Sequence, residues 1–345
     1  MSVGSFVLAG QFPGQGPEEA LHRAVEAADA SERSGLDAVW LAEHHFVPYG
    51  VCPSAVTLAA LVLGRTRRIA VGTAVSVLPN AHPVALGEQA ALLHLTTGGR
   101  FTLGVGRGGP WIDLSVFGGG TAAYERQFPE DLELLLRWLR EPRVGAEGER
   151  YRFPEVDVVP RPGDAVAGPS RPPGVLVACT SPGTVRLAAR HCLPMLLGMH
   201  CGDEEKAGMT ALWQQEAVAA GHPRDRVRAS AAAHVSAGVV QVADTREEAV
   251  GLLTKAMPGW LRNGLAAHRT VDGRKRTLRD PSAYTELLCS LHPVGPPRWC
   301  ADRLAATADA TGVRRFALLV EGTGDLTATR ANVGRLGAEV LPLLR

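Results

Sequence analysis

The sequence predicts an α/β fold in which eight parallel strands alternate with helices, a (β/α)8 TIM barrel. Short apolar runs alternate with longer amphipathic segments along the chain, a pattern typical of α/β proteins. The apolar runs are nearly continuous in hydrophobic character, as parallel strands covered on both faces require. Polar clusters directly follow several of the runs, and active sites of such barrels lie where the strands end. Residues 1–345 are expected to form one domain.

The first half of the chain gives the clearest pattern. The expected strands are 5–10, 38–42, 69–77 and 101–106. The expected helices are 18–34, 53–64 and 83–95. Gly35 follows the first helix, as glycine commonly does after a helix end, and Pro53 stands near the start of the second. The segment 69–77 is rich in β-branched residues, which favours a strand.

The second half departs from strict alternation. A fourth helix is expected at 125–140, followed by an inserted hairpin at 147–161 and a loop rich in Pro and Gly at 163–173. The remaining strands are expected at 174–179, 193–199, within 229–242 and at 315–320. The remaining helices are expected after 181 and at 204–220, 245–261 and 326–344.

A polar and basic stretch at 262–280 has no apolar periodicity and predicts a long loop before the last strand. Long loops in compact enzymes are usually lids over the active site or irregular surface segments. Both interpretations of this stretch are open. Loops at 111–121 and 258–297 are expected to supply walls of the substrate pocket, so the substrate itself is not predicted.

Composition excludes several classes of protein. The chain is 46% apolar and 21% charged with a net charge of +1, which predicts no broad surface for nucleic acid or anionic lipid. Its six cysteines form no CxxC pair, so neither a metal site nor a disulfide framework is expected. A signal peptide is not expected, nor is a membrane span, because no run of about 18 apolar residues occurs. Reduced thiols favour a cytoplasmic protein.

A cluster of proton-transfer groups follows the second strand, where Glu43, His44 and His45 are consecutive. Histidine is the side chain whose unperturbed pKa lies near neutrality. The cluster therefore predicts acid–base catalysis at the end of the barrel where strands terminate. The alternative is that these histidines only anchor the loop.

Glycines occupy the end of the fourth strand, at Gly104 and Gly106, and the residues after it, at Gly108 and Gly109, with Arg107 among them. Arginine offers a planar fork of donors suited to phosphate. The spacing does not match a P-loop. Gly104, Gly106 and Gly109 match the nicotinamide-binding GxGxxG pattern in spacing. We do not assign that function, because no suitable acidic residue or second βαβ half accompanies them. Small residues in the third strand, at 72–76, also leave room for a flat ring, although taken alone they favour tight barrel packing.

A possible helix start follows the fifth strand, where Ser181 precedes Pro182 and Thr184 lies nearby. Exposed amides at a helix N-terminus, together with hydroxyl groups, form an anion site. Alternatively, Ser181 is only a helix cap. Together with Arg107, these residues predict a phosphate clamp made by two successive strand ends. A phosphorylated cofactor could then lie across the barrel mouth with its reactive ring over the histidines.

Four segments resemble the bacterial luciferase-like, flavin-dependent monooxygenases. They are SGLDAVWLAEHHF at 34–46, GTAVSVLPNAHPVALGEQAALL at 72–93, GGRFTLGVGRGGPWIDLSVFG at 98–118 and SPGTVRLAAR at 181–190. They occur in the order and at the spacing of the family over at least the first 200 residues. The resemblance implies a (β/α)8 barrel, often a homodimer, that binds reduced FMN supplied by a separate flavin reductase.

The resemblance also implies roles for individual residues. The family's catalytic histidine corresponds to His44, with Glu43 and His45 beside it. The non-proline cis peptide that lies beneath the flavin corresponds to Ala74 and Val75. The phosphate-binding arginine corresponds to Arg107, followed by Gly108, and the Ser/Thr cluster to Ser181 and Thr184. The light-emitting luciferase subunit carries an acidic residue near the position of Thr180, which this chain lacks, so light emission is not expected.

The implied reaction is an oxygenation. Reduced FMN would react with O2 to give a flavin hydroperoxide, with His44 as the acid–base group, and the oxygen would pass to a small organic substrate by hydroxylation, epoxidation or Baeyer–Villiger insertion. The abundance of Ala, Arg and Gly indicates a GC-rich, actinobacterial genome and hence a role in natural-product biosynthesis. Two alternatives stay open: a deazaflavin-dependent oxidoreductase on the same barrel, and a flavin-binding partner subunit without activity.

Overall fold

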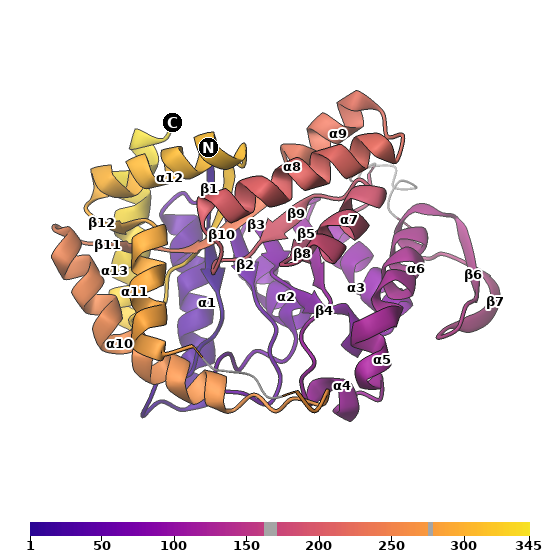
Figure 1. Cartoon of the computed structure of the whole chain (residues 1–345), viewed down its shortest axis with the longest axis horizontal. Coiled ribbons are helices and arrows are strands. Elements are labelled where there is room, and N and C mark those ends of the chain that lie inside the picture. The colour runs from indigo at the N-terminus through magenta and orange to yellow at the C-terminus, as the bar shows by residue number, and fades with distance from the viewer. Residues whose placement is uncertain (162–170, 275–278) are drawn as a thin grey trace.

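The chain folds into a closed barrel of parallel strands surrounded by helices (Figure 1). The computed structural model describes residues 1–161, 171–274 and 279–345. The strands pair in the order β3-β2-β1-β13-β10-β9-β8-β5-β4, and pairing of β3 with β5 closes the barrel. These strands are β1 (Ser2–Val7), β2 (Ala38–Leu41), β3 (Ala70–Thr73), β4 (Ser76–Val77), β5 (Phe101–Gly106), β8 (Gly174–Cys179), β9 (Met195–Leu197), β10 (Val235–Val239) and β13 (Arg315–Leu319). The predicted (β/α)8 barrel is confirmed.

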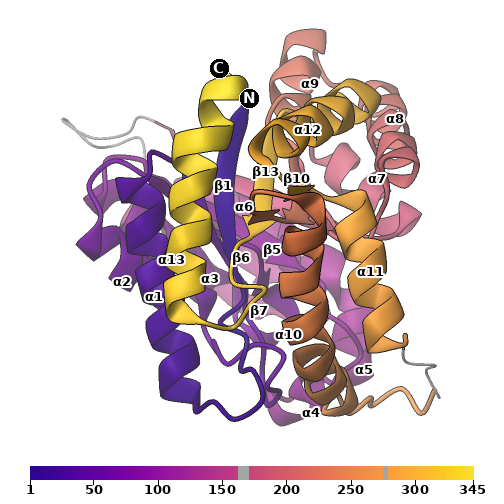
Figure 2. The same ribbon diagram turned by 90° about the vertical axis from the view of Figure 1, so that its left-hand side faces the viewer.

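Helices connect successive strands and cover the outside of the barrel, and the two ends of the chain lie close together (Figure 2). The main helices are α1 (Pro17–Arg33), α2 (Ala55–Arg65), α3 (Pro83–Thr96), α6 (Phe128–Arg140), α7 (Pro182–Arg190), α8 (Asp203–Ala219), α10 (Arg246–Ala266) and α13 (Leu326–Arg335). Shorter or additional helices are α4 (Asp113–Val116), α5 (Gly120–Ala122), α9 (Arg224–Ala231), α11 (Pro281–Leu291) and α12 (Pro297–Thr311). Two short 3-10 helices are η1 (Leu78–Asn80) and η4 (Leu341–Leu343), and two short π-helices are η2 (Ala123–Gln127) and η3 (Leu336–Val340).

The alternation of side chains along β2 shows how the sequence separates the two sides of the barrel wall. Ala38 and Trp40 belong to the apolar cluster that fills the barrel and extends to α10. Val39 and Leu41 belong to the cluster between the barrel and its helices. Both faces of the strand are therefore buried, as its nearly continuous apolar sequence predicts.

The third barrel position is not one continuous strand. The expected strand at 69–77 is divided into β3 and β4, and the peptide bond Ala74–Val75 between them is cis. β3 pairs with β2 and β5, whereas β4 pairs only with β5. The Thr73 hydroxyl donates to the Gly104 carbonyl oxygen at 2.7 Å and accepts from the Gly104 amide at 2.9 Å. These bonds join β3 to β5 next to the break.

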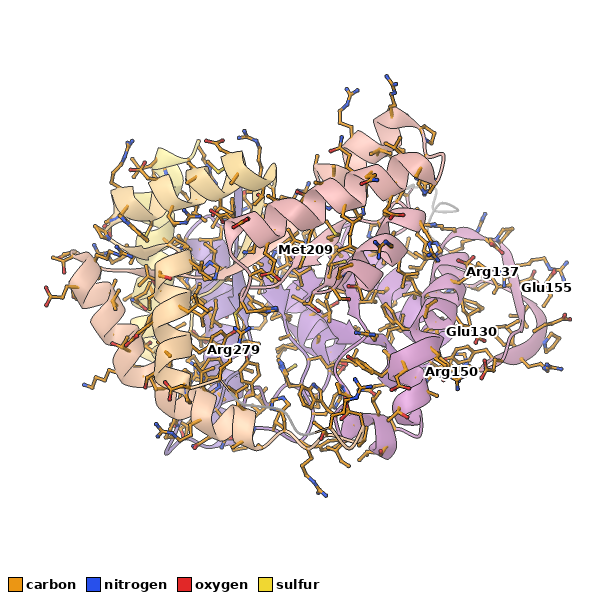
Figure 3. All side chains as sticks on the ribbon, in the orientation of Figure 1. Glu130, Arg137, Arg150, Glu155, Met209 and Arg279 are labelled. Carbon is orange, nitrogen blue, oxygen red and sulfur yellow. The ribbon has the colours of Figure 1, made fainter. Side chains whose placement is uncertain are left out.

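A hairpin is present after the fourth helix as β6 (Arg143–Glu147) and β7 (Arg152–Asp157), which pair antiparallel, so it begins four residues before the expected range of 147–161. It projects from the barrel beside α6, where Glu130 and Arg150 face each other (Figure 3). The Glu130 carboxylate accepts a hydrogen bond from the Arg150 amide at 3.0 Å, and the Arg150 guanidinium pairs with buried Asp131 at 2.9 Å. The hairpin is therefore fixed to the helix that precedes it. Most of the loop expected at 163–173 lies outside the described residues.

The loop expected at 262–280 is shorter than the sequence indicates. α10 continues to Ala266, and residues 275–278 lie outside the described residues. The helices α11 and α12 and the short pair β11 (Gln241–Val242) and β12 (Val294–Gly295) follow or flank this region and were not expected. The expected helix 326–344 is α13 followed by η3 and η4.

Substitution of Gly104 tests the contact that closes the barrel. A Cβ atom at Gly104 would lie 2.0 Å from the Thr73 carbonyl oxygen, so β5 could not keep its distance from β3. Because overpacking a rigid core is destabilising, we expect Gly104→Ala to lower the free energy of unfolding by about 3 kcal/mol or more in urea titrations. Gly64→Ala, in α2, is the control, because a Cβ there meets open space, and alanine favours helix by about 1 kcal/mol. Equal stability of Gly104→Ala and the wild type would contradict this contact.

Candidate active site

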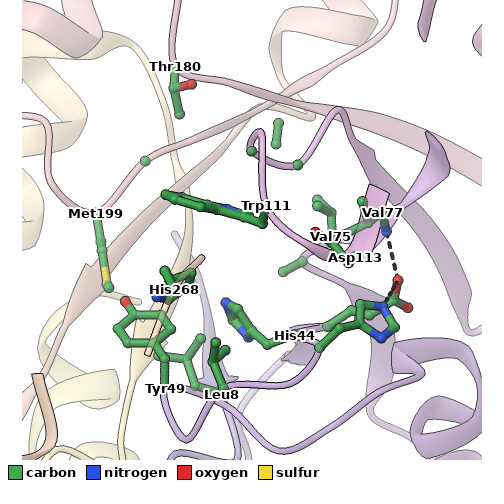
Figure 4. A pocket seen from close by; sticks show the side chains of 18 of the residues that line it. Leu8, His44, Tyr49, Val75, Val77, Trp111, Asp113, Thr180, Met199 and His268 are labelled. Atoms are coloured by element: carbon green, nitrogen blue, oxygen red, sulfur yellow. Dashed lines mark hydrogen bonds and ion pairs between the residues drawn. The ribbon is translucent and has the colours of Figure 1, made fainter. Parts of the chain in front are cut away.

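A cavity of about 460 Å³ lies at the end of the barrel where the strands terminate. Its lining includes residues that follow β1, β2, β3, β5, β8 and β9, so six separate strand ends contribute to it. Most of its walls are apolar. His44, Tyr49, Trp111, Thr180, Met199 and His268 lie around this cavity (Figure 4). The predicted location of the site is thus occupied by a large cavity.

His44 projects into the cavity from the loop after β2. Its ring makes an edge contact with Tyr49, with 5.1 Å between ring centroids. Its Nδ1 atom is buried and has no hydrogen-bond partner among the described residues. Burial, followed by the nearby His268 and His45, lowers the pKa of His44 to about 3. The imidazole is therefore neutral near pH 7, with one protonated and one unprotonated ring nitrogen.

Glu43 lies beside the cavity, but both its carboxylate oxygens accept hydrogen bonds from backbone amides. One accepts from the Ala55 amide, at the start of α2, at 3.1 Å, and the other from the Val77 amide of β4 at 3.0 Å. The same oxygen that binds Val77 lies 3.5 Å from Nε2 of His45. Glu43 thus connects the loop after β2 to α2 and β4. His45 is nearly buried and packs edge-on against Phe117, at 4.9 Å between centroids.

Ala74 and Val75, joined by the cis peptide, form part of the cavity wall. The cis bond is found where the resemblance implies it. Glycines opposite leave space for these residues: a Cβ at Gly106 would lie 2.5 Å from Val75, and one at Gly108 would lie 2.8 Å from Val77. Gly108 also has a positive φ of 69°, which favours glycine. The glycines at the end of β5 and just after it therefore let the backbone approach Val75 and Val77, and Gly108 lines the cavity.

Arg107 lies in a second, smaller cavity of about 220 Å³, next to the first. Its guanidinium carbon lies 4.1 Å from the centre of the Tyr124 ring, and one of its nitrogens donates to the Tyr124 hydroxyl at 3.2 Å. Ser181 and Thr184 line the same small cavity. The structure thus brings the arginine after β5 together with the hydroxyl groups after β8.

Ser181 begins α7. Its hydroxyl oxygen accepts from the Thr184 amide at 3.5 Å and lies 3.2 Å from the Thr184 hydroxyl. This confirms that Ser181 caps the helix, and its position on the small cavity adds a helix N-terminus to that cavity. Consecutive residues line the two cavities, because Gly108 and Thr180 line the large one and Arg107 and Ser181 line the small one.

A strap of backbone covers the large cavity. The Ile112 amide donates to the Arg269 carbonyl at 2.8 Å, the Val271 amide donates to the Pro110 carbonyl at 2.9 Å, and Trp111 forms a bridge with Thr270. His268 and Trp111 are in ring contact at 4.7 Å between centroids. In Figure 1 the chain after α10 runs toward α4 along the lower edge. Part of the expected loop before the last strand therefore lies at the site.

Several polar residues of the cavity were not predicted individually, although Asp113 and His268 belong to the loops that were expected to supply its walls. Tyr49 belongs to the same loop as His44, so its position after the second strand could have indicated it. Asp113, which accepts from the Asn80 amide group at 2.7 Å, follows the glycines after β5. His268 gives no comparable signal, because it reaches the site only through the folding of the segment after α10.

Within residues 1–161, 171–274 and 279–345, no group of His, Cys, Asp and Glu is arranged to hold a metal ion. Over those same ranges, no helix is long and apolar enough to cross a membrane.

Comparison with known sequences identifies one family. A statistical model of the luciferase-like monooxygenases matches residues 1–315. The chain is 28% identical to the alkanal monooxygenase alpha chain of the Kryptophanaron alfredi symbiont, over all of this chain and 99% of that protein. It is 33% identical to 4-hydroxyprotoasukamycin monooxygenase of Streptomyces nodosus subsp. asukaensis, over 76% of this chain and 69% of that protein.

Solved structures share the fold. Monooxygenase RslO1 from Streptomyces bottropensis has a TM-score of 0.79 at 23% identity, covering 99% of both chains. The oxygenating constituent of 3,6-diketocamphane monooxygenase of Pseudomonas putida, solved with FMN, has a TM-score of 0.77 at 21% identity, covering 100% of this chain and 99% of that one. An F420-dependent secondary alcohol dehydrogenase has a TM-score of 0.75 at 14% identity, covering 100% and 99%. At these identities the likeness concerns the fold.

The neutral state of His44 predicts a loss of stability in acid. The unfolded chain takes up a proton on this residue below a pH of about 6.5, whereas the folded chain does so only near pH 3. Protons therefore favour the unfolded state in this range, and the free energy of unfolding falls as the pH falls. We expect His44→Asn to lose roughly 1 to 2 kcal/mol less than the wild type between pH 6.5 and 5 in urea titrations. His22→Asn, which changes an exposed histidine of α1, should follow the wild-type curve. If the free energies of unfolding of His44→Asn and the wild type changed equally with pH, the pKa of His44 would not be lowered by folding.

Proposed function

The chain belongs to the luciferase-like monooxygenases, and we propose that it is an FMNH2-dependent monooxygenase that activates O2 and oxygenates a small, largely apolar organic substrate. The observation that carries the proposal is the pair of adjoining cavities. The large one contains the neutral imidazole of His44, and the small one contains a cation, two hydroxyl groups and a helix N-terminus. A cofactor with a flat ring at one end and a phosphate at the other fits this division.

We assign the phosphate of FMN to the small cavity. The Arg107 guanidinium would pair with the phosphate, and its stacking on Tyr124 reduces the freedom that binding would have to remove. The hydroxyl groups of Ser181 and Thr184 and the Gly183 amide at the start of α7 would donate the remaining hydrogen bonds. The ring end of the cofactor would lie in the large cavity, near Ala74, Val75 and Gly108.

Reduced FMN, when bound, would supply the electrons that activate dioxygen. His44 would hold or donate a proton beside the reacting atoms, because its ring lines the large cavity, and its low pKa keeps it uncharged. The apolar walls and the strap over the cavity would exclude water, which favours oxygen transfer over release of hydrogen peroxide. We infer that Glu43 is a positioning residue that holds the loop of His44 against β4, with His45 beside it.

The two alternatives to this function lead to different experiments. A deazaflavin oxidoreductase would bind F420 more tightly than FMN, so titration with each cofactor separates the two. A partner subunit without activity would bind flavin but form no product. The presence of both His44 and Arg107 in the expected cavities favours an active enzyme.

The setting of the reaction is also part of the proposal. We infer a separate flavin reductase as the source of FMNH2 and a homodimer of one-domain chains as the assembly. The relationship to a Streptomyces monooxygenase agrees with the actinobacterial origin that the composition indicates, and supports natural-product biosynthesis as the context.

Replacement of Arg107 tests the phosphate assignment. Arg107→Gln removes the cation, so we expect FMN to bind at least about tenfold more weakly, because a charge-assisted pair is lost. Riboflavin, which lacks the phosphate, should bind the variant and the wild type alike. Binding is measured by quenching of flavin fluorescence. Arg186→Gln, which changes a surface arginine of α7 paired with Glu216, should leave both affinities unchanged. An equal loss for FMN and riboflavin would contradict a phosphate contact.

Replacement of His44 tests the proton-transfer role. Decanal is a suitable probe, because relatives of this chain are named alkanal monooxygenases. With chemically reduced FMN and ¹⁸O2, the wild type should form labelled decanoic acid. We expect His44→Ala to reduce this product by at least about a hundredfold, the usual effect of a lost acid–base group, and to release more hydrogen peroxide. His22→Ala should behave as the wild type. Unchanged product formation by His44→Ala would remove this residue from the mechanism.

A further inference from the structure

Tyr49 occupies a fixed position in the wall of the large cavity. Its ring stacks on Trp260 at 4.9 Å between centroids and 11° between planes, and meets His44 edge-on. Trp260 Nε1 also donates to the Tyr49 carbonyl at 3.1 Å. On a further side, α10 approaches so closely that a Cβ at Gly264 would lie 2.8 Å from the Tyr49 Cβ. These contacts leave the ring little freedom to turn.

The hydroxyl group of Tyr49 is not required for any of these contacts. Phe12 also stacks on Trp260, at 5.3 Å, with a phenyl ring alone. No residue in the described parts of the chain accepts a hydrogen bond from the Tyr49 hydroxyl, although Tyr49 lines the cavity. Figure 4 shows its oxygen directed toward the side of the cavity where Met199 lies. A donor is therefore presented to the cavity without a protein partner.

The surroundings keep this hydroxyl protonated and place it in a mostly apolar part of the wall. Burial raises the pKa of Tyr49 far above its ordinary value, with a smaller effect of Tyr284, so the phenol is neutral at any physiological pH. Leu8, Leu196 and Met199 provide apolar wall around the site. Nδ1 of the neighbouring His268 already lies 2.8 Å from the Gly264 carbonyl, so that nitrogen is occupied.

We propose that Tyr49 is a specificity-determining residue, whose hydroxyl donates a hydrogen bond to a carbonyl oxygen on an otherwise apolar substrate. The inference rests on the proposed function, because it takes the large cavity as the place where substrate meets cofactor. A substrate without the acceptor would leave the phenol unpaired in an apolar wall. Sites built to bond one polar group reject analogues that lack it.

A pair of probes that differ only at the acceptor tests this. The probes are 2-acetylnaphthalene and 2-ethylnaphthalene, which share a skeleton and differ by a carbonyl in place of a CH2 group. Their affinities are measured by calorimetry on the full-length chain, without FMN and then with FMN. The wild type should prefer the ketone by about five- to tenfold, the effect of one net hydrogen bond. Tyr49→Phe keeps the ring and should lose this preference, while its affinity for the hydrocarbon stays within about twofold.

Tyr284→Phe is the matched control. Tyr284 is another partly buried tyrosine with a raised pKa near Tyr49, but it does not line the cavity. This variant should keep the preference for the ketone. The proposal is overturned if the wild type binds both probes equally or neither, or if the preference survives in Tyr49→Phe. Binding of FMN is measured separately on the same variants. Its absence from the wild type would refute the proposed cofactor, whereas normal FMN binding with no ketone preference would refute the role of Tyr49 alone.

Discussion

The close approach of β5 to the β3–β4 segment is the constraint on which the rest of the site depends. Gly104 allows the two backbones to touch, and the Thr73 hydroxyl bonds to both its amide and its carbonyl. Beyond this point the chain turns through the cis peptide into β4, whose Val77 amide binds Glu43. The loop that carries His44 is thereby tied to the same strand. One short contact between strands therefore sets the wall of the large cavity and the position of the imidazole.

The division of polar groups between the two cavities determines how an elongated ligand would be oriented in the site. The cation, Arg107, and the helix N-terminus at Ser181 lie in the small cavity, while the large one holds a neutral imidazole within mostly apolar walls. A charged end of a ligand is stabilised in the first environment and an uncharged ring in the second. The orientation of an elongated ligand thus follows from the distribution of charge alone.

Much of this arrangement could be predicted from the sequence, because it depends on local signals. The apolar runs give the strands, and residues directly after strands, such as His44 and Arg107, must lie at one end of a parallel barrel. The break between β3 and β4 could not be found from apolar pattern, since 69–77 remains apolar across it. His268 could not be singled out either, although its loop was expected at the pocket, because it is brought to the site by pairing between 110–112 and 269–271, which involves backbone atoms and leaves no pattern in the side chains.

The backbone pairing between 110–112 and 269–271 affects which parts of the site can change during evolution. The cover of the cavity is held by main-chain hydrogen bonds at Ile112 and Val271, which any residue other than proline can form as donor. Side chains on the inner surface of the cover, including those of Trp111 and His268, can therefore be exchanged without losing the closure itself. Natural drift or directed evolution could reshape the chamber over the reacting atoms there, while the barrel, the phosphate site and His44 remain intact.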